Sequence, residues 1–134
     1  MVFVGGSSRQ PTTEIEYQRL LSIKLFAIGS VGYGGGRSSG SLALRVVMMS
    51  TNAAALLLDV ATKGTTEAKL YALCGIRRLR LSEFDRLAAE LLRENETVST
   101  ASGCVFSHDS ARFLVDHIKT GQLDDYLKNL PTNK

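Results

Sequence analysis

Apolar residues recur at helical spacing along most of this chain. Between Ile15 and Phe26 they are dense enough to predict a largely buried helix over residues 13–28. Thr13 and Glu16 fit the capping pattern in which a threonine, and a glutamate three positions later, bond to the first unpaired backbone amides. The chain is therefore expected to enter its first helix soon after a start rich in glycine and serine.

The same spacing predicts a series of helices along the rest of the chain. The expected helices cover residues 41–48, 53–61, 65–76, 84–94, 111–119 and 122–130. The composition of residues 95–106 permits either a strand or a helix, because this stretch combines β-branched with small side chains. We expect a helix there, packed closely against its neighbours.

The length of the chain indicates one domain. A chain of 134 residues can bury a core without metals or many disulfides. We expect a flexible segment over residues 1–12, a single helical domain over 13–130 and a tail over 131–134. The fold class is all-α, with about six or seven helices in pairs that form a right-handed solenoid or an irregular bundle. No apolar run approaches the ~20 residues that span a bilayer, so no membrane span is expected.

Residues 65–76 and 95–106 align as a weak repeat with an offset of 30 residues, which sets Cys74 against Cys104. Each copy follows a leucine-rich segment, so the repeating unit is interpreted as a helix pair. Coincidence in a chain rich in alanine and leucine explains the match equally well. If the repeat holds, the two cysteines occupy equivalent places on neighbouring helices and could form a disulfide. The alternative is two buried, reduced thiols.

The glycine-rich segment of residues 29–40 is the strongest candidate for contact with a partner. So much glycine argues against a regular element, and a long loop is predicted. The segment lacks the first glycine, the lysine and the preceding strand of a phosphate-binding loop, so no nucleotide is expected. The loop residues expected to contact a protein are Tyr33, Gly34, Gly35, Gly36 and Arg37.

Arg77 and Arg78 form a second candidate contact. They either complement the dipole at the end of a helix or provide a basic patch for an acidic protein surface. The net charge of +3 is too small to indicate nucleic acid binding, and no aromatic residues alternate with the arginines to stack on bases. We therefore expect a protein partner and no nucleic acid.

Patterns for catalysis and metal binding are weak. The two histidines and two cysteines do not have the spacing of a zinc site. Cys104 with His108 and Asp109 could supply a thiol nucleophile and its base, although a helix start explains residues 107–110 more simply. We expect no metal, no cofactor and no enzymatic activity.

The segment of residues 56–76, LLLDVATKGTTEAKLYALCGI, resembles a HEAT or armadillo unit. A small helical chain of this kind, with two cysteines and no active site, is also similar to the bacterial immunity proteins that neutralise peptidoglycan amidase effectors of type VI secretion. That second resemblance implies a periplasmic inhibitor, its leader removed, which plugs the toxin's active-site cleft with the loop around Tyr33. No family motif matches residue by residue.

Three hypotheses for the function follow. The first is an immunity protein that binds a toxin through residues 29–40. The second is a cytoplasmic scaffold or adaptor of the HEAT class, whose partner lies on a concave helical face. The third is a small thiol enzyme that uses Cys104. A homodimer is compatible with each of them.

Overall fold

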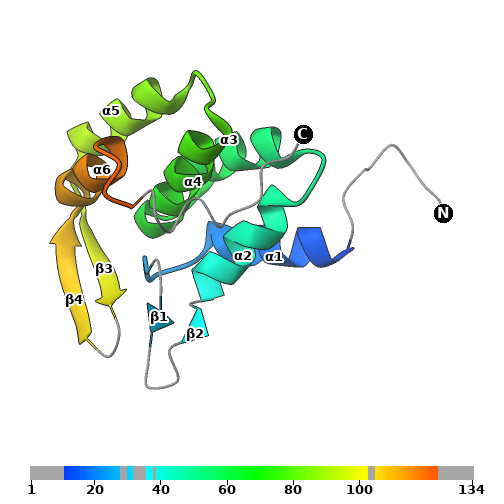
Figure 1. Ribbon diagram of the computed structural model, residues 1–134, viewed down its shortest axis with the longest axis horizontal. Coiled ribbons are helices and arrows are strands. Elements are labelled where there is room, and N and C mark those ends of the chain that lie inside the picture. Colours follow the sequence, from blue (N-terminus) through cyan, green and yellow to red (C-terminus); the bar gives the residue numbers. More distant parts are fainter. Residues whose placement is uncertain (1–10, 28–29, 32–35, 38, 103–104, 124–134) are drawn as a thin grey trace.

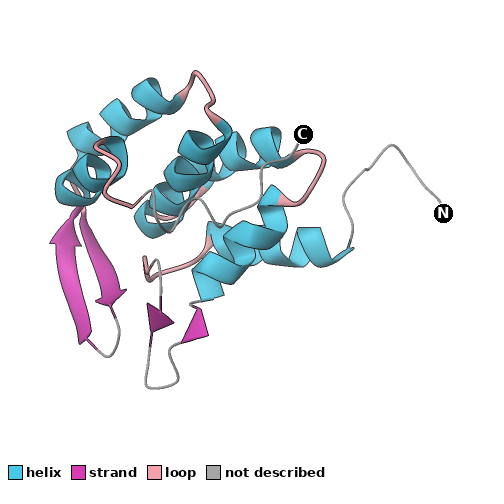
Figure 2. Ribbon diagram, viewed as in Figure 1, coloured by secondary structure: helices cyan, strands magenta, loops and turns pink. Residues whose placement is uncertain are grey.

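The computed structural model describes residues 11–27, 30–31, 36–37, 39–102 and 105–123. In chain order the elements are α1 (Pro11–Leu21), β1 (Ser30–Val31), β2 (Gly36–Arg37), α2 (Ser39–Met48), α3 (Ala53–Lys63), α4 (Thr66–Leu79), α5 (Phe84–Glu94), β3 (Thr97–Ser102), β4 (Val105–Ser110) and α6 (Ala111–Lys119). The helices form one packed body, from which two small hairpins project at the same end (Figures 1 and 2). The predicted mainly helical fold class is confirmed.

Helix α4 is the centre of the body. Every residue from Leu70 to Ile76 is buried, and the helix packs against α2, α3, α5 and α6. A helix that is apolar on all sides is stable only when it is enclosed, which explains its central place. At Gly75 a Cβ would lie 2.9 Å from the methyl groups of Leu57, so the absent side chain lets α3 approach closely.

The ends of α4 follow from its local sequence. The hydroxyl of Thr65 accepts a hydrogen bond from the backbone N–H of Ala68 at 3.1 Å, so it caps the first turn. Arg80 ends the helix in the left-handed conformation, at φ 59°. Ser110 caps α6 in the same way as Thr65, through the N–H of Phe113 at 3.2 Å.

The first predicted helix is too long. Helix α1 ends at Leu21, whereas the prediction extended it to residue 28. Phe26 is extended instead, and its N–H donates to the carbonyl of Ser99 at 2.8 Å. The apolar side chain of Phe26 is buried, at 4% exposure, but it is buried from an extended segment. Periodicity alone does not distinguish these two ways of burying a short apolar run.

The prediction of a helix over residues 95–106 is wrong. Strands β3 and β4 form an antiparallel hairpin, with Thr97 paired to Ser110 and Ser102 to Val105. Threonine and valine favour the extended backbone of a strand, which is why the composition of this segment also permitted a strand. The second copy of the proposed repeat is therefore not a helix pair.

The repeat consequently does not place the two cysteines on neighbouring helices. Cys74 lies in α4, while Cys104 falls outside the described residues. Residues 1–10 and 124–134 also lie outside them, and these ranges contain most of the predicted flexible start, most of the last predicted helix and the tail.

Candidate protein-contact surface

Both hairpins are attached to one face of α4. Glu67 and Tyr71 lie one turn apart on this helix, so their side chains share a face. The carboxylate of Glu67 accepts a hydrogen bond from the backbone N–H of Ser99 in β3, at 3.1 Å. The hydroxyl of Tyr71 accepts from the N–H of Ala27 at 2.8 Å and donates to the carbonyl of the same residue at 2.9 Å. Ala27 precedes β1, so one helical turn holds the bases of both hairpins.

Phe26 and Ala27, which are adjacent in the chain, connect these two attachments. The N–H of Phe26 bonds to Ser99, and its ring contacts the ring of Tyr71 at a centroid distance of 4.9 Å. The hydroxyl of Ser41, at the start of α2, donates to the carbonyl of Ala27 at 2.8 Å. The bases of the two hairpins are thus bonded to α2, to α4 and to each other.

Gly40 is required where α2 crosses Tyr71. A Cβ at position 40 would lie 2.3 Å from a ring carbon of Tyr71, which no side chain could tolerate without moving the ring. One glycine of the segment 29–40 therefore serves close packing against α4.

The structure partly corrects the predicted loop. Ser30 pairs with Arg37 and Val31 with Gly36, so the segment contains a short antiparallel ladder, and residues 39–40 belong to α2. The hydrogen bonds of this ladder offset the conformational entropy that the glycines lose, which was the reason for predicting a loop. Tyr33, Gly34 and Gly35 lie outside the described residues. Strand β1 contacts β3, which sets the two hairpins side by side (Figure 1).

Arg77 and Arg78 do not join this surface. They occupy the last turn of α4, ten and eleven residues after Glu67, which corresponds to about 15 Å or more along the helix. Both side chains are partly buried and engaged in interactions within the fold. Their position agrees with the helix-end alternative.

Strand β4 has an open outer edge. The N–H of Ala111 bonds to the carbonyl of Glu96 at 2.8 Å, which continues the ladder of the pair Val98–Asp109. Ser99 instead directs its N–H and its carbonyl away from β4, to Glu67 and Phe26. In antiparallel ladders the two kinds of pair alternate. The backbone groups of His108, opposite Ser99, and of Phe106, two residues earlier, therefore point away from β3.

This edge lacks the usual protection of edge strands. The sequence of β4, VFSHDS, contains no proline or lysine, the residues that commonly discourage further strand pairing. Phe106 is 67% exposed, and Ser107 and His108 are exposed as well. Sequence reasoning missed this feature because it assigned the first part of the strand to a helix.

The hairpin does not assemble a catalytic relay from its polar residues. The Oγ of Ser99 lies 3.5 Å from Nδ1 of His108. Asp109 lies on the opposite face of the strand, where its carboxylate accepts from the hydroxyl of Thr100 at 2.8 Å. Asp109 cannot orient His108, so the geometry gives no support to a Ser–His–Asp site. Among the described residues, no group of three or more His, Cys, Asp or Glu side chains is placed to hold a metal ion.

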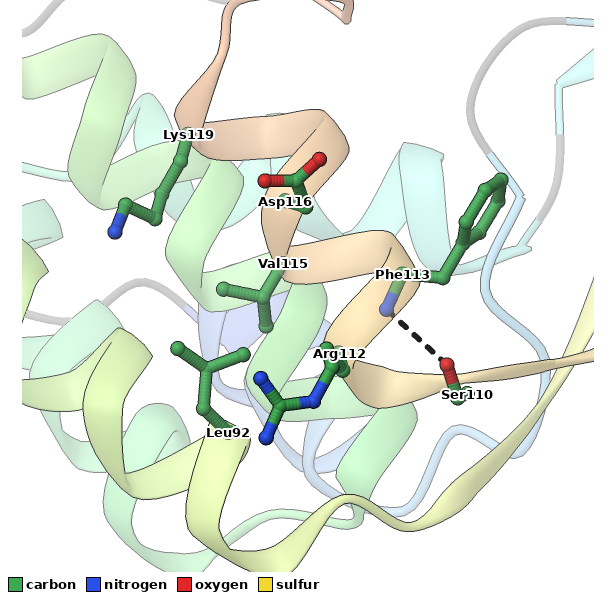
Figure 3. Close-up of a pocket in the computed structure, with 7 residues that line it drawn as sticks. All are labelled: Leu92, Ser110, Arg112, Phe113, Val115, Asp116 and Lys119. Atoms are coloured by element: carbon green, nitrogen blue, oxygen red, sulfur yellow. Dashed lines mark hydrogen bonds between the residues drawn. The ribbon is translucent and has the colours of Figure 1, made fainter.

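A groove on the helical body was also missing from the sequence predictions. It lies between α5 and α6, with a volume of about 430 Å³, and Figure 3 shows Leu92 and Val115 between the charged ends of Arg112 and Lys119. The described residues that line it are Leu92, Ser110, Arg112, Phe113, Val115, Asp116 and Lys119. Two helices of the body thus form a mixed apolar and charged surface.

The charges on α5 and on the β3–β4 hairpin do not suit DNA. The helix α5 carries Asp85, Glu90 and Glu94 against two arginines, one of which pairs with Glu90 at 3.4 Å. The described parts of β3 and β4 contain no lysine or arginine. Phosphate contacts dominate affinity for DNA, and the described residues of α5, β3 and β4 carry four acidic side chains against two basic ones.

No known family model, curated protein or solved structure matches this chain. Within the described ranges, no helix has both the length and the apolar character needed to cross a membrane.

Proposed function

We propose that this protein is a non-enzymatic protein-binding protein, whose contact surface is the β1–β2 hairpin braced by β3. The observation that carries the proposal is the double attachment of the hairpin bases to Glu67 and Tyr71 of α4. A contact element held in place before binding loses less conformational entropy in the complex. This rigid mounting is what a projecting recognition element requires.

The narrower proposal is an immunity protein that blocks a cell-wall-degrading toxin in the periplasm. Two hairpins that project side by side are a suitable shape for insertion into an active-site cleft (Figure 1). The β1–β2 segment carries Tyr33 and Arg37, and tyrosine and arginine dominate binding energy at many interfaces.

A second candidate, an adaptor that binds its partner on a helical face, is favoured by the groove between α5 and α6. Its apolar floor and charged rim suit a protein segment rather than a membrane. The two candidates use separate surfaces, so substitutions distinguish them.

The test measures binding and inhibition with purified peptidoglycan amidase effectors of type VI secretion. We expect tight binding to one of them, loss of its peptidoglycan hydrolysis, and an affinity at least about 30-fold lower for the double variant Tyr33→Ala/Arg37→Ala. Met49→Ser is the matched control, because Met49 is 67% exposed just after the opposite end of α2 and should not matter.

Two outcomes would contradict this proposal. If no effector is bound, the immunity function is wrong. If a partner is bound but only the groove double variant Arg112→Ala/Lys119→Ala weakens it, the adaptor is correct and the hairpin is not the contact.

A further inference from the structure

Strand β4 can accept another strand, whereas β3 cannot. The outer edge of β3 is occupied at Ser99 by Phe26 and by Glu67. On β4 the outward backbone groups of Phe106 and His108 have no hydrogen-bond partner among the described residues. Figure 1 places β4 at the outer margin of the molecule, away from the other hairpin. A sheet of only two strands gains stability when strands are added, so this edge is suited to strand pairing.

We propose that β4 pairs antiparallel with β4 of a second copy of this chain, forming a two-fold symmetric dimer. The strands then run in the order β3, β4, β4 and β3 through one continuous sheet. This interface goes beyond the proposed function, because it uses the outer edge of β4 rather than the β1–β2 hairpin.

The hydrogen-bonding pattern selects a register. When Ser107 lies on the two-fold axis opposite its own copy, Phe106 lies opposite the second copy's His108, and both residues of each pair point outward. Such pairs exchange both of their backbone hydrogen bonds. A shift that centres His108 would pair Phe106 with Ser110, but Ser110 is the N-cap of α6, so a helix would begin at the interface. The register centred on Ser107 uses residues 105–109 alone.

The side chains of β4 are compatible with self-pairing. The strand contains one charged residue, Asp109, whose carboxylate bonds to Thr100, and in this register it lies opposite position 105 rather than another acid. Like charges therefore do not meet across the axis. The exposed ring of Phe106 in each copy lies beside His108 of the other copy. This favourable pair of planar side chains therefore occurs once on each side of the two-fold axis.

The molecular mass of the full chain in solution shows whether the dimer forms. Sedimentation equilibrium of the wild-type protein, from about 10 to about 500 µM, should show a monomer–dimer equilibrium. His108→Pro removes an outward N–H without removing a backbone hydrogen bond between β3 and β4, and Phe106→Lys places a charge on the edge. We expect each variant to raise the dissociation constant at least about tenfold. Ile15→Ser, at a residue 58% exposed on α1, is the control and should dimerise as the wild type does.

A cysteine at the axis tests the register. In a non-hydrogen-bonded antiparallel pair the Cα atoms are about 4.5 Å apart, within the range of a disulfide. Oxidised Ser107→Cys should give a covalent dimer whose link maps to position 107 in both chains. Thr97→Cys, exposed on the inner strand, should give no such link.

Three results would overturn the proposal. One is a monomer at every concentration. Another is a dimer that both edge variants leave unchanged while circular dichroism shows them folded. The third is a Ser107→Cys protein that dimerises but forms no link at position 107.

Discussion

The helical body and the hairpin end are held together by different forces. In the body, side chains from α2, α3, α4, α5 and α6 fill a shared core, and many of them have no exposed surface. At the hairpin end, only a few side chains such as Val98 and Phe26 reach that core, and hydrogen bonds from Glu67, Tyr71 and Ser41 hold the bases of two short ladders. Stability is therefore distributed in the body and concentrated at the hairpin bases. Substitutions in the body should therefore promote global unfolding, whereas substitutions at the hairpin bases should promote local opening.

The largest effect is expected in the body. Leu57→Ala removes a fully buried side chain where α3 meets Gly75, and it should lower the free energy of unfolding by about 2 to 5 kcal/mol. Urea unfolding followed by circular dichroism measures this loss. Leu42→Ala, at a residue 49% exposed on α2, is the control and should change stability little. Equal losses in both variants would mean that the core does not carry the stability.

A smaller but more local effect is expected at Tyr71. Tyr71→Phe keeps the ring against Phe26 but leaves the N–H and carbonyl of Ala27 without the hydroxyl, and it should cost about 1 to 3 kcal/mol. Hydrogen exchange should accelerate at Ala27 more than in the core of α4. A uniform acceleration along the chain would show that the hairpin base and the body open as one unit.

The smallest effect is expected at Glu67, which is only partly buried. Glu67→Ala removes the acceptor of the Ser99 N–H and should cost about 1 kcal/mol. Glu67→Gln retains an acceptor oxygen and is the matched control. Exchange of the Ser99 amide, measured by NMR, should rise in the alanine variant and much less in the glutamine variant. The same rate in both would show that Glu67 does not hold β3.

Local sequence patterns were sufficient to predict most of the helices and some of their ends. The predictions near residues 41–48, 53–61, 84–94 and 111–119 match α2, α3, α5 and α6 to within a few residues. The helix expected over residues 65–76 also begins where predicted, with Thr65 as its N-cap. These features depend on neighbours within a few positions, where periodicity and capping act.

The candidate surface was only partly predictable. The segment 29–40 was identified from its glycines, but the ladder within it and the attachment of its base were not. Arg77 and Arg78 were a second candidate contact with a helix-end alternative, and the structure places them in the last turn of α4, away from the hairpin bases. Charge and side-chain type suggest what can bind, whereas the packing of α4 decides which residues act together.

Sequence alone determined that this chain forms packed helices, because helix-forming periodicity and caps are local properties. The tertiary structure decided that residues 95–106 lie mostly in a hairpin, that Phe26 is extended, and that β4 has an open edge. Each of these outcomes depends on a partner distant in the chain: Glu67 bonds to Ser99 across 32 residues, and Phe26 bonds to the same residue from a still earlier segment. Strand pairing is a non-local interaction, so no window of the sequence contains both halves of it.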